Sequence, residues 1–231
     1  MLRRGTIKHR LLVCALIFGL FTMAPAVGLA GTTDAFDRPD GGLGSTETGL
    51  TWSVFNGNWG IRADRAKLLS ARYRNTIAYA TVDAGMASGF TVSADIALST
   101  TPRRANAGLT LLYVSHANNL FCKVEVTPGN PGGLMSIGRR LNNVTTSLLA
   151  YRRDTGFVNG RTYHVSCGRS GNVVTMTVEG ADVGSLTISR TLTSGELAAL
   201  GSATRVGLRT HAARDEDDKG SVYDDFAVTV P

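Results

Sequence analysis

The sequence predicts an all-β domain, a two-sheet antiparallel β-sandwich, and three observations support this. Short segments in which apolar and polar residues alternate recur along the chain, and this alternation is the pattern of a half-buried strand. The 27 glycines form no regular repeat and suit tight turns between such segments. Only Ser194–Leu200 reads as a helical turn, with Ser194 as its predicted N-cap. About a dozen short strands with almost no helix is typical of a β-sandwich or jelly roll.

The chain begins with a segment that we exclude from the fold. Basic residues, Arg3 and Arg4 among them, precede an apolar run from Leu11 to Met23, and small residues follow up to Ala30. This order predicts a secretory signal peptide over residues 1–30, since the run is too short for a comfortable membrane span. An uncleaved signal anchor is the alternative, and the paired arginines also resemble a twin-arginine export signal. We therefore expect a secreted, extracellular protein whose one domain is residues 31–231.

The charge balance changes once this leader is removed. The chain has 24 Lys+Arg and 18 Asp+Glu, and four of the bases but none of the acids lie in the leader, which leaves 20 against 18. The high isoelectric point therefore comes mostly from the leader, and nucleic acid is not an expected partner. No other apolar run approaches the length of a bilayer span, so no stable membrane span is expected after cleavage.

The strands are predicted from alternation and from turn residues between them. The first hairpin has its turn near Ala63–Asp64, and the clearest one-sided strand runs from Phe90 to Leu98. In the last strand, Tyr223 and Phe226 fall on opposite faces, and we expect this strand to pair with the segment that follows Asp34. The expected strands, in order, lie within residues 60–68, 75–82, 90–98, 108–116, 120–126, 134–140, 147–152, 162–169, 172–179, 184–190, 204–210 and 221–230.

Two cysteines remain outside the leader. Cys122 shares a strand face with Leu120 and Val124, and Cys167 shares one with Tyr163 and Val165, so both point toward the apolar side. In an oxidising compartment this favours a disulfide over two buried thiols.

Segments near the two ends of the domain resemble a known family. The opening Phe36-Asp-Arg-Pro-Asp-Gly-Gly-Leu-Gly, followed by Glu47–Trp52 and Gly57-Asn-Trp-Gly60, resembles the start of secreted bacterial concanavalin A-like modules of the laminin-G-like kind, and Tyr223-Asp-Asp-Phe-Ala-Val resembles their last strand. The resemblance implies a concanavalin A-like jelly roll and an activity such as carbohydrate binding, polysaccharide cleavage or adhesion. We expect both tryptophans, Trp52 and Trp59, to be core residues.

The resemblance also implies a structural calcium ion, because many members of the superfamily hold one near the rim of the sandwich. If the first and last strands pair, four carboxylates converge, and clustered oxygens are what calcium needs. The alternative is that these residues cap turns. A second candidate is the acidic run Asp215–Asp218, although such runs are usually solvated loops. The four candidate calcium ligands are Asp34, Asp37, Asp224 and Asp225.

No catalytic motif of the related enzymes is present. The paired carboxylates of the glucanases, spaced two apart on one strand, are missing, and Glu125 beside Lys123 is the nearest substitute. Lyases use Tyr or His beside a base, and Arg209 and His211 share one strand face, but the lyase motifs are also missing. Whether the protein is an enzyme is left open, with a non-catalytic role favoured. The candidate ligand-binding residues are Lys123, Glu125, Tyr151, His164, Arg209 and His211.

We therefore expect a secreted module that binds polysaccharide or a cell-surface glycan on a sheet face or loop rim. Two alternatives stay open: a glycoside hydrolase or lyase with an atypical site, and a structural or adhesion module with a protein partner.

Overall fold

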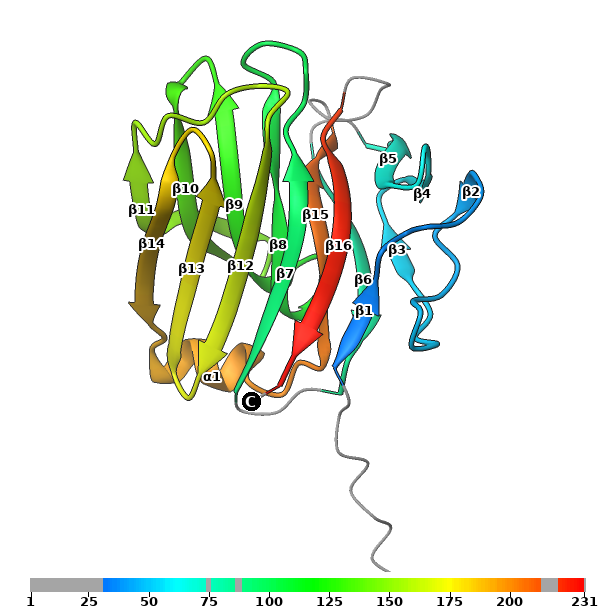
Figure 1. The fold of residues 1–231 in the computed structure, drawn as a ribbon. Coiled ribbons are helices and arrows are strands. Elements are labelled where there is room, and N and C mark those ends of the chain that lie inside the picture. The colour runs from blue at the N-terminus through cyan, green and yellow to red at the C-terminus, as the bar shows by residue number, and fades with distance from the viewer. Residues whose placement is uncertain (1–30, 74–75, 86–88, 213–219, 231) are drawn as a thin grey trace, which may run out of the picture.

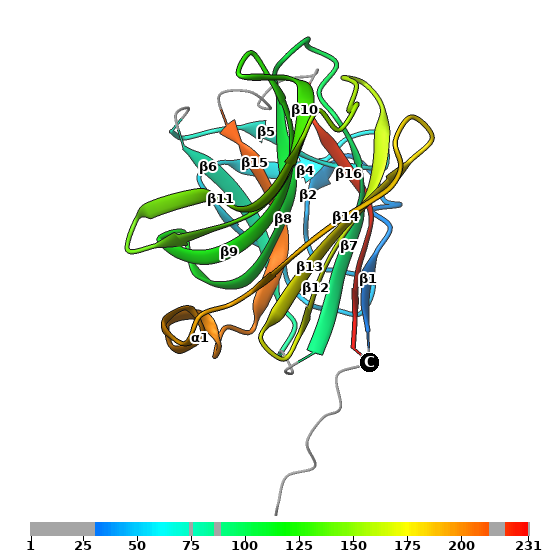
Figure 2. The ribbon, with the colours of Figure 1, turned by 90° about the vertical axis from the view of Figure 1, so that its left-hand side faces the viewer.

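The computed structural model describes residues 31–73, 76–85, 89–212 and 220–230. These residues form two antiparallel sheets that pack face to face, with one short helix, α1 (Ser194–Leu200), at one end (Figures 1 and 2). The predicted all-β sandwich is confirmed. The signal peptide predicted over residues 1–30 and the acidic run Asp215–Asp218 lie outside the described residues. No helix among the described residues is long and apolar enough to cross a membrane.

The sheet nearer the viewer in Figure 1, here called the front sheet, has nine strands among the described residues. The first eight follow each other across the sheet, and β1 pairs with β16 off this path. The strands are β14 (Gly184–Thr191), β13 (Val173–Gly180), β12 (Thr162–Ser170), β7 (Gly89–Ala97), β16 (Val222–Thr229), β5 (Ala66–Ser70), β4 (Asn58–Ile61), β2 (Gly41–Gly42) and β1 (Thr32–Asp34).

The other sheet, here called the back sheet, has seven strands among the described residues. In order across the sheet they are β11 (Val144–Arg153), β10 (Asn130–Leu141), β9 (Asn118–Thr127), β8 (Ala105–Ser115), β15 (Arg205–His211), β6 (Ile77–Asp83) and β3 (Ser53–Phe55).

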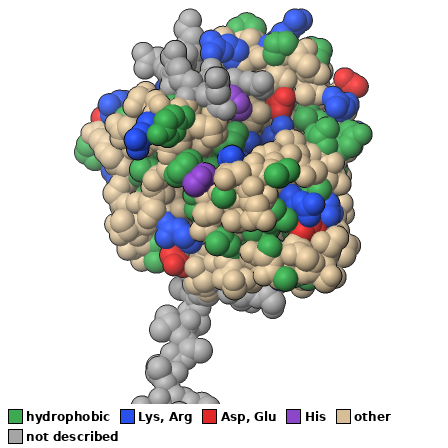
Figure 3. All heavy atoms as spheres, turned by 180° about the vertical axis from the view of Figure 1, so that it is seen from behind, with side chains coloured by type: hydrophobic (Ala, Val, Ile, Leu, Met, Phe, Trp, Pro, Cys, Tyr) green, Lys and Arg blue, Asp and Glu red, His purple; other side chains and the backbone are tan. Residues whose placement is uncertain are grey.

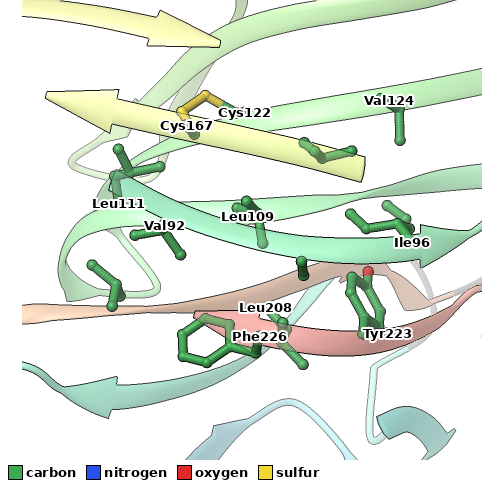
Figure 4. Packing of buried hydrophobic residues seen from close by; sticks show 14 of the residues in the cluster. Val92, Ile96, Leu109, Leu111, Cys122, Val124, Cys167, Leu208, Tyr223 and Phe226 are labelled. Carbon is green, nitrogen blue, oxygen red and sulfur yellow. A yellow bond between two sulfur atoms is a disulfide. The ribbon is translucent and has the colours of Figure 1, made fainter. Parts of the chain in front are cut away.

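The facing sides of the two sheets form one apolar core. In β7, the predicted one-sided strand, Phe90, Val92 and Ile96 are buried, and Val92 and Ile96 lie toward Leu109 and Leu111 of β8 (Figure 4). Cys122 of β9 and Cys167 of β12 form a disulfide that ties the back sheet to the front sheet, as predicted. Such a crosslink over 45 residues adds about 2–4 kcal/mol to the free energy of unfolding.

The first and last strands pair, as predicted, with Asp34 opposite Phe226, but the paired strand β1 ends at Asp34 and does not include the segment that follows it. Trp52 and Trp59 are core residues, only 7% and 2% exposed. Two local predictions were wrong. Tyr223 and Phe226 are both buried, because the register shifts between Asp224 and Ala227 and a bulge turns the strand over. The N-cap of α1 is Thr193 and not Ser194, because a capping box links the Thr193 side chain with Glu196.

A buried carboxylate holds the opening segment in place. Asp34 is fully buried, and its oxygens accept hydrogen bonds from the Arg38 guanidinium at 2.6 and 3.0 Å and from the Trp52 indole nitrogen at 2.7 Å. Arg38 also donates to the Leu43 carbonyl, so one carboxylate fixes a turn and an aromatic side chain together.

We predict that Asp34→Ala lowers the free energy of unfolding by about 3–5 kcal/mol, because it leaves the Arg38 charge and the Trp52 N–H without their acceptor. Asp40→Ala is the matched control, since Asp40 is exposed, lies 3.8 Å from Arg62 and accepts one exposed hydrogen bond from the Ala63 N–H. The control is expected to change stability by less than about 1 kcal/mol in a urea titration. Equal effects of the two changes would contradict the assignment.

Candidate functional site

The outer face of the back sheet carries a hollow of about 290 Å³. Figure 3 shows the molecule from behind, where basic, acidic and histidine side chains lie close together in a depression of the surface. Its lining comes from six neighbouring strands and the residue before β6: Thr76, Ile77, Tyr79, Asn106, Phe121, Lys123, Arg140, Thr145, Ser147, Arg209 and His211.

The pairing of strands explains why these side chains meet. Tyr79 of β6 lies opposite Arg209 of β15, and Arg209 lies opposite Gly108 of β8. Gly108 lies in turn opposite Lys123 of β9, so these residues form one row across the sheet. Because residues paired across an antiparallel ladder project to the same face, the row exposes its side chains on the outer face. Gly108 adds no side chain in the middle of the row.

A second glycine makes room beside this row. Gly138 of β10 lies opposite Phe121, and a Cβ added there would come within 2.5 Å of the Phe121 ring. Glycine therefore lets the ring lie against the sheet. The guanidinium carbon of Arg209 lies 4.4 Å from the centre of this ring, which is a cation–π contact.

Buried polar groups beside the hollow satisfy one another. Glu125 accepts hydrogen bonds from Lys123 and, at 3.1 Å, from the Asn106 amide. The Asn106 oxygen in turn accepts a 3.0 Å hydrogen bond from Arg209. All four side chains are at least nine-tenths buried, and a buried charge is tolerated only when it is paired and hydrogen-bonded. The network therefore fixes Arg209 and Lys123 in defined positions.

Glu125 is ionised in this setting. Burial by itself raises the pKa of its carboxyl, but the Lys123 charge and the hydrogen bonds from Lys123, Thr127 and Asn130 outweigh burial and lower the pKa to about 2. A carboxylate with this low pKa, already held by several donors, is a poor general acid or base near neutral pH.

We predict that Glu125 makes the protein less stable in acid. Its pKa is lower in the folded chain than the ordinary 4.5, so the stabilisation is present above pH 4.5 and is lost as the pH falls toward 2. Glu125→Gln should flatten part of the fall in unfolding free energy between these values. Glu179→Gln, at an exposed position of β13, is the control and should leave the profile unchanged. Identical pH profiles for both variants would contradict the proposed role.

The structure brings some of the predicted binding residues together and leaves others apart. Lys123, Arg209 and His211 line the hollow, and Glu125 lies beside it. Tyr151 is exposed on β11, in the same cross-strand row but outside the lining. His164 belongs to the front sheet, where its Nδ1 lies 2.7 Å from an Asp95 oxygen.

Sequence reasoning missed several lining residues, above all Tyr79, Asn106, Phe121 and Arg140. Strand alternation puts Asn106 and Phe121 on the polar side of their strands, and this was the available signal. Which strands are neighbours could not be read from that alternation, so the residues could not be grouped into a site.

The four aspartates predicted to bind calcium do not share one environment. The Asp34 carboxylate already accepts hydrogen bonds from Arg38 and Trp52. Burial raises the pKa of Asp224, and the negative charges of Asp225 and Asp37 raise it further, against the lowering effect of the Asp225 backbone N–H and of Arg65. Among the described residues, no three His, Cys, Asp or Glu side chains are arranged to hold a metal ion. Calcium binding stays a prediction.

The calcium prediction is tested by thermal unfolding. Calcium added after chelation should raise the melting temperature, because a ligand bound only to the native state stabilises it. Asp225→Asn should remove that increase, whereas Asp40→Asn, at an exposed aspartate that pairs with Arg62, should keep it. An unchanged melting temperature on chelation would contradict the prediction.

Comparison with known proteins supports the fold. No protein-family model and no curated protein sequence matches the chain. Among solved structures, the chain is similar to the carbohydrate-binding module CBM66 from Bacillus subtilis, with a TM-score of 0.52, 16% identity, and coverage of 77% of this chain and 90% of that one. It is also similar to lectin UEA-II complexed with galactose, with a TM-score of 0.61, 11% identity, and coverage of 87% and 98%.

Part of a larger enzyme has a similar fold. The chain resembles GH43B of a Bacteroides ovatus xyloglucan locus, with a TM-score of 0.61 and 14% identity over 86% of this chain, but it spans only 39% of that protein. At these identities the likeness shows the β-sandwich and no more.

Proposed function

We propose that the protein is a secreted, non-catalytic glycan-binding module of the concanavalin A-like superfamily, and that its ligand sits in the hollow on the outer face of the back sheet. The observation that carries this proposal is the convergence of polar side chains from neighbouring strands around one depression of about 290 Å³. This volume is close to the lower end of the range for small-ligand sites, ~300 Å³. The sandwich folds of a carbohydrate-binding module and a lectin support the proposal at the level of architecture.

The lining suits a sugar that is recognised mainly through hydrogen bonds. Thr145 and Ser147 bring hydroxyl groups from β11. The described lining residues expose no aromatic ring for stacking: Tyr79 and Phe121 are almost fully buried, and Trp52 and Trp59 are in the core. We therefore expect affinity to depend on polar contacts, which fix the orientation of the ligand.

Export is part of the same proposal. A signal peptide over residues 1–30 would deliver the domain outside the cytoplasm, by the general or the twin-arginine route. The Cys122–Cys167 disulfide supports an oxidising destination, because such bonds are rare in reducing compartments.

A polysaccharide-cleaving activity is the second candidate. The described lining residues include no Asp or Glu, so they offer no carboxylate pair for glycoside hydrolysis. It does contain Tyr79 and His211 beside Arg209, which are residue types that a lyase uses. New chain ends released from a bound polymer would establish this activity, and an intact polymer would support the binding role.

We predict that Thr145→Trp, which adds a large ring at the lining of the hollow, weakens glycan binding by about tenfold or more, a cost of about 1.4 kcal/mol or more in binding free energy. Thr187→Trp is the matched control, since Thr187 is an exposed threonine on an edge strand of the front sheet. A glycan array would identify the ligand, and calorimetric titration would compare the variants. Equal affinity in both variants would place the site elsewhere. If no glycan on the array binds, the result would argue against a glycan ligand.

A further inference from the structure

The charged side chains among the described lining residues are all basic. Three of the described lining residues, Lys123, Arg140 and Arg209, are basic, His211 is a fourth potential cation, and none is acidic. Glu125 beside the hollow neutralises one base through its ion pair with Lys123.

Arg140 is the base that the described fold leaves without a counter-charge. It lies on β10, opposite Asn119 of β9 and Thr145 of β11, and is half-buried. Its Nε is buried without a hydrogen-bond partner, and none of the described residues gives its guanidinium a hydrogen bond or an ion pair. A partly desolvated guanidinium with unused donors is costly unless a ligand accepts from it.

Three other half-buried arginines pair with buried carboxylates, whereas Arg169 and Arg205 donate to carbonyl and hydroxyl oxygens. Arg38 donates to the buried carboxylate of Asp34, and both Arg139 and Arg190 donate to the buried carboxylate of Glu196. Arg139 is the sequence neighbour of Arg140, yet it points to the opposite side of β10 and has its carboxylate there. Arg140 differs from Arg38, Arg139 and Arg190 in having no carboxylate partner among the described residues.

We infer that the ligand of the hollow is an acidic glycan, a polysaccharide whose uronate carboxylate is bound by Arg140. The planar guanidinium matches a carboxylate with two parallel hydrogen bonds. Thr145 and Ser147 lie at the same wall as Arg140 and can bind the ring hydroxyls. This inference rests on the proposed function, because it names the class of glycan that the same site takes.

The test compares two polymers that differ only in charge. Polygalacturonate and the same polymer with its carboxyl groups reduced to alcohols are titrated into the purified protein. Three variants are measured beside the unchanged protein: Arg140→Gln, Arg140→Lys, and Arg161→Gln as the matched control. Arg161 lies outside the hollow, with a side chain that is 65% exposed and an ion pair to Asp182 at 3.6 Å.

We expect the acidic polymer to bind and the reduced polymer to bind at least about tenfold more weakly, which is the loss of one charge-assisted contact. Arg140→Gln should lose about the same factor on the acidic polymer only. Arg140→Lys should fall between the two, and Arg161→Gln should bind like the unchanged protein. Melting temperatures verify that each variant is folded.

Two results would overturn the inference in different ways. Equal binding of both polymers, or an Arg140→Gln variant that binds the acidic polymer normally, would refute an acidic ligand and leave glycan binding intact. Binding of neutral array glycans without either polymer would do the same. If no glycan binds, acidic or neutral, the proposed function would be refuted as well.

Discussion

The hydrogen-bonded network of Lys123, Glu125, Asn106 and Arg209 is the interaction on which the candidate site depends. The middle strands of the back sheet are buried on both faces, one against the apolar core and one beneath the hollow. Charged groups can occupy the second face only if they pair with one another, because an unpaired buried charge costs several kcal/mol. The Glu125 carboxylate meets this requirement, and in doing so it orients two bases toward the hollow.

The same physical rule operates at the other buried carboxylates. Asp34 anchors the opening segment to Arg38 and Trp52, and Glu196 joins α1 to Arg139 and Arg190. The disulfide between Cys122 and Cys167 ties the two sheets together from inside the core. The framework around the site is thus held by a few specific contacts as well as by apolar burial, and this rigidity favours a preformed binding surface.

Much of the fold could be predicted from the sequence because its signals are local. Alternation in Phe90–Leu98 defined β7, the turn at Ala63–Asp64 defined the first hairpin, and the faces of Cys122 and Cys167 predicted their pairing. The face of Tyr223 was wrong because a bulge at Asp224–Asp225 is set by pairing with β7, which no local pattern reports. The site was harder to predict. Tyr79, Lys123 and Arg140 come together because β6, β9 and β10 lie in one sheet, and alternation along a strand does not reveal which strands are neighbours. His164 was predicted to belong to the same binding site as Lys123, but it lies on the front sheet.

The most direct test of the account is a map of backbone amide chemical shifts while a short oligogalacturonide is added to the labelled protein. The account predicts that the shifts which move belong to the strands that line the hollow, with Lys123, Arg140 and Arg209 among the largest changes and β12 to β14 unaffected. Changes confined to the front sheet or to the outer edge of β14, with the hollow unmoved, would contradict it.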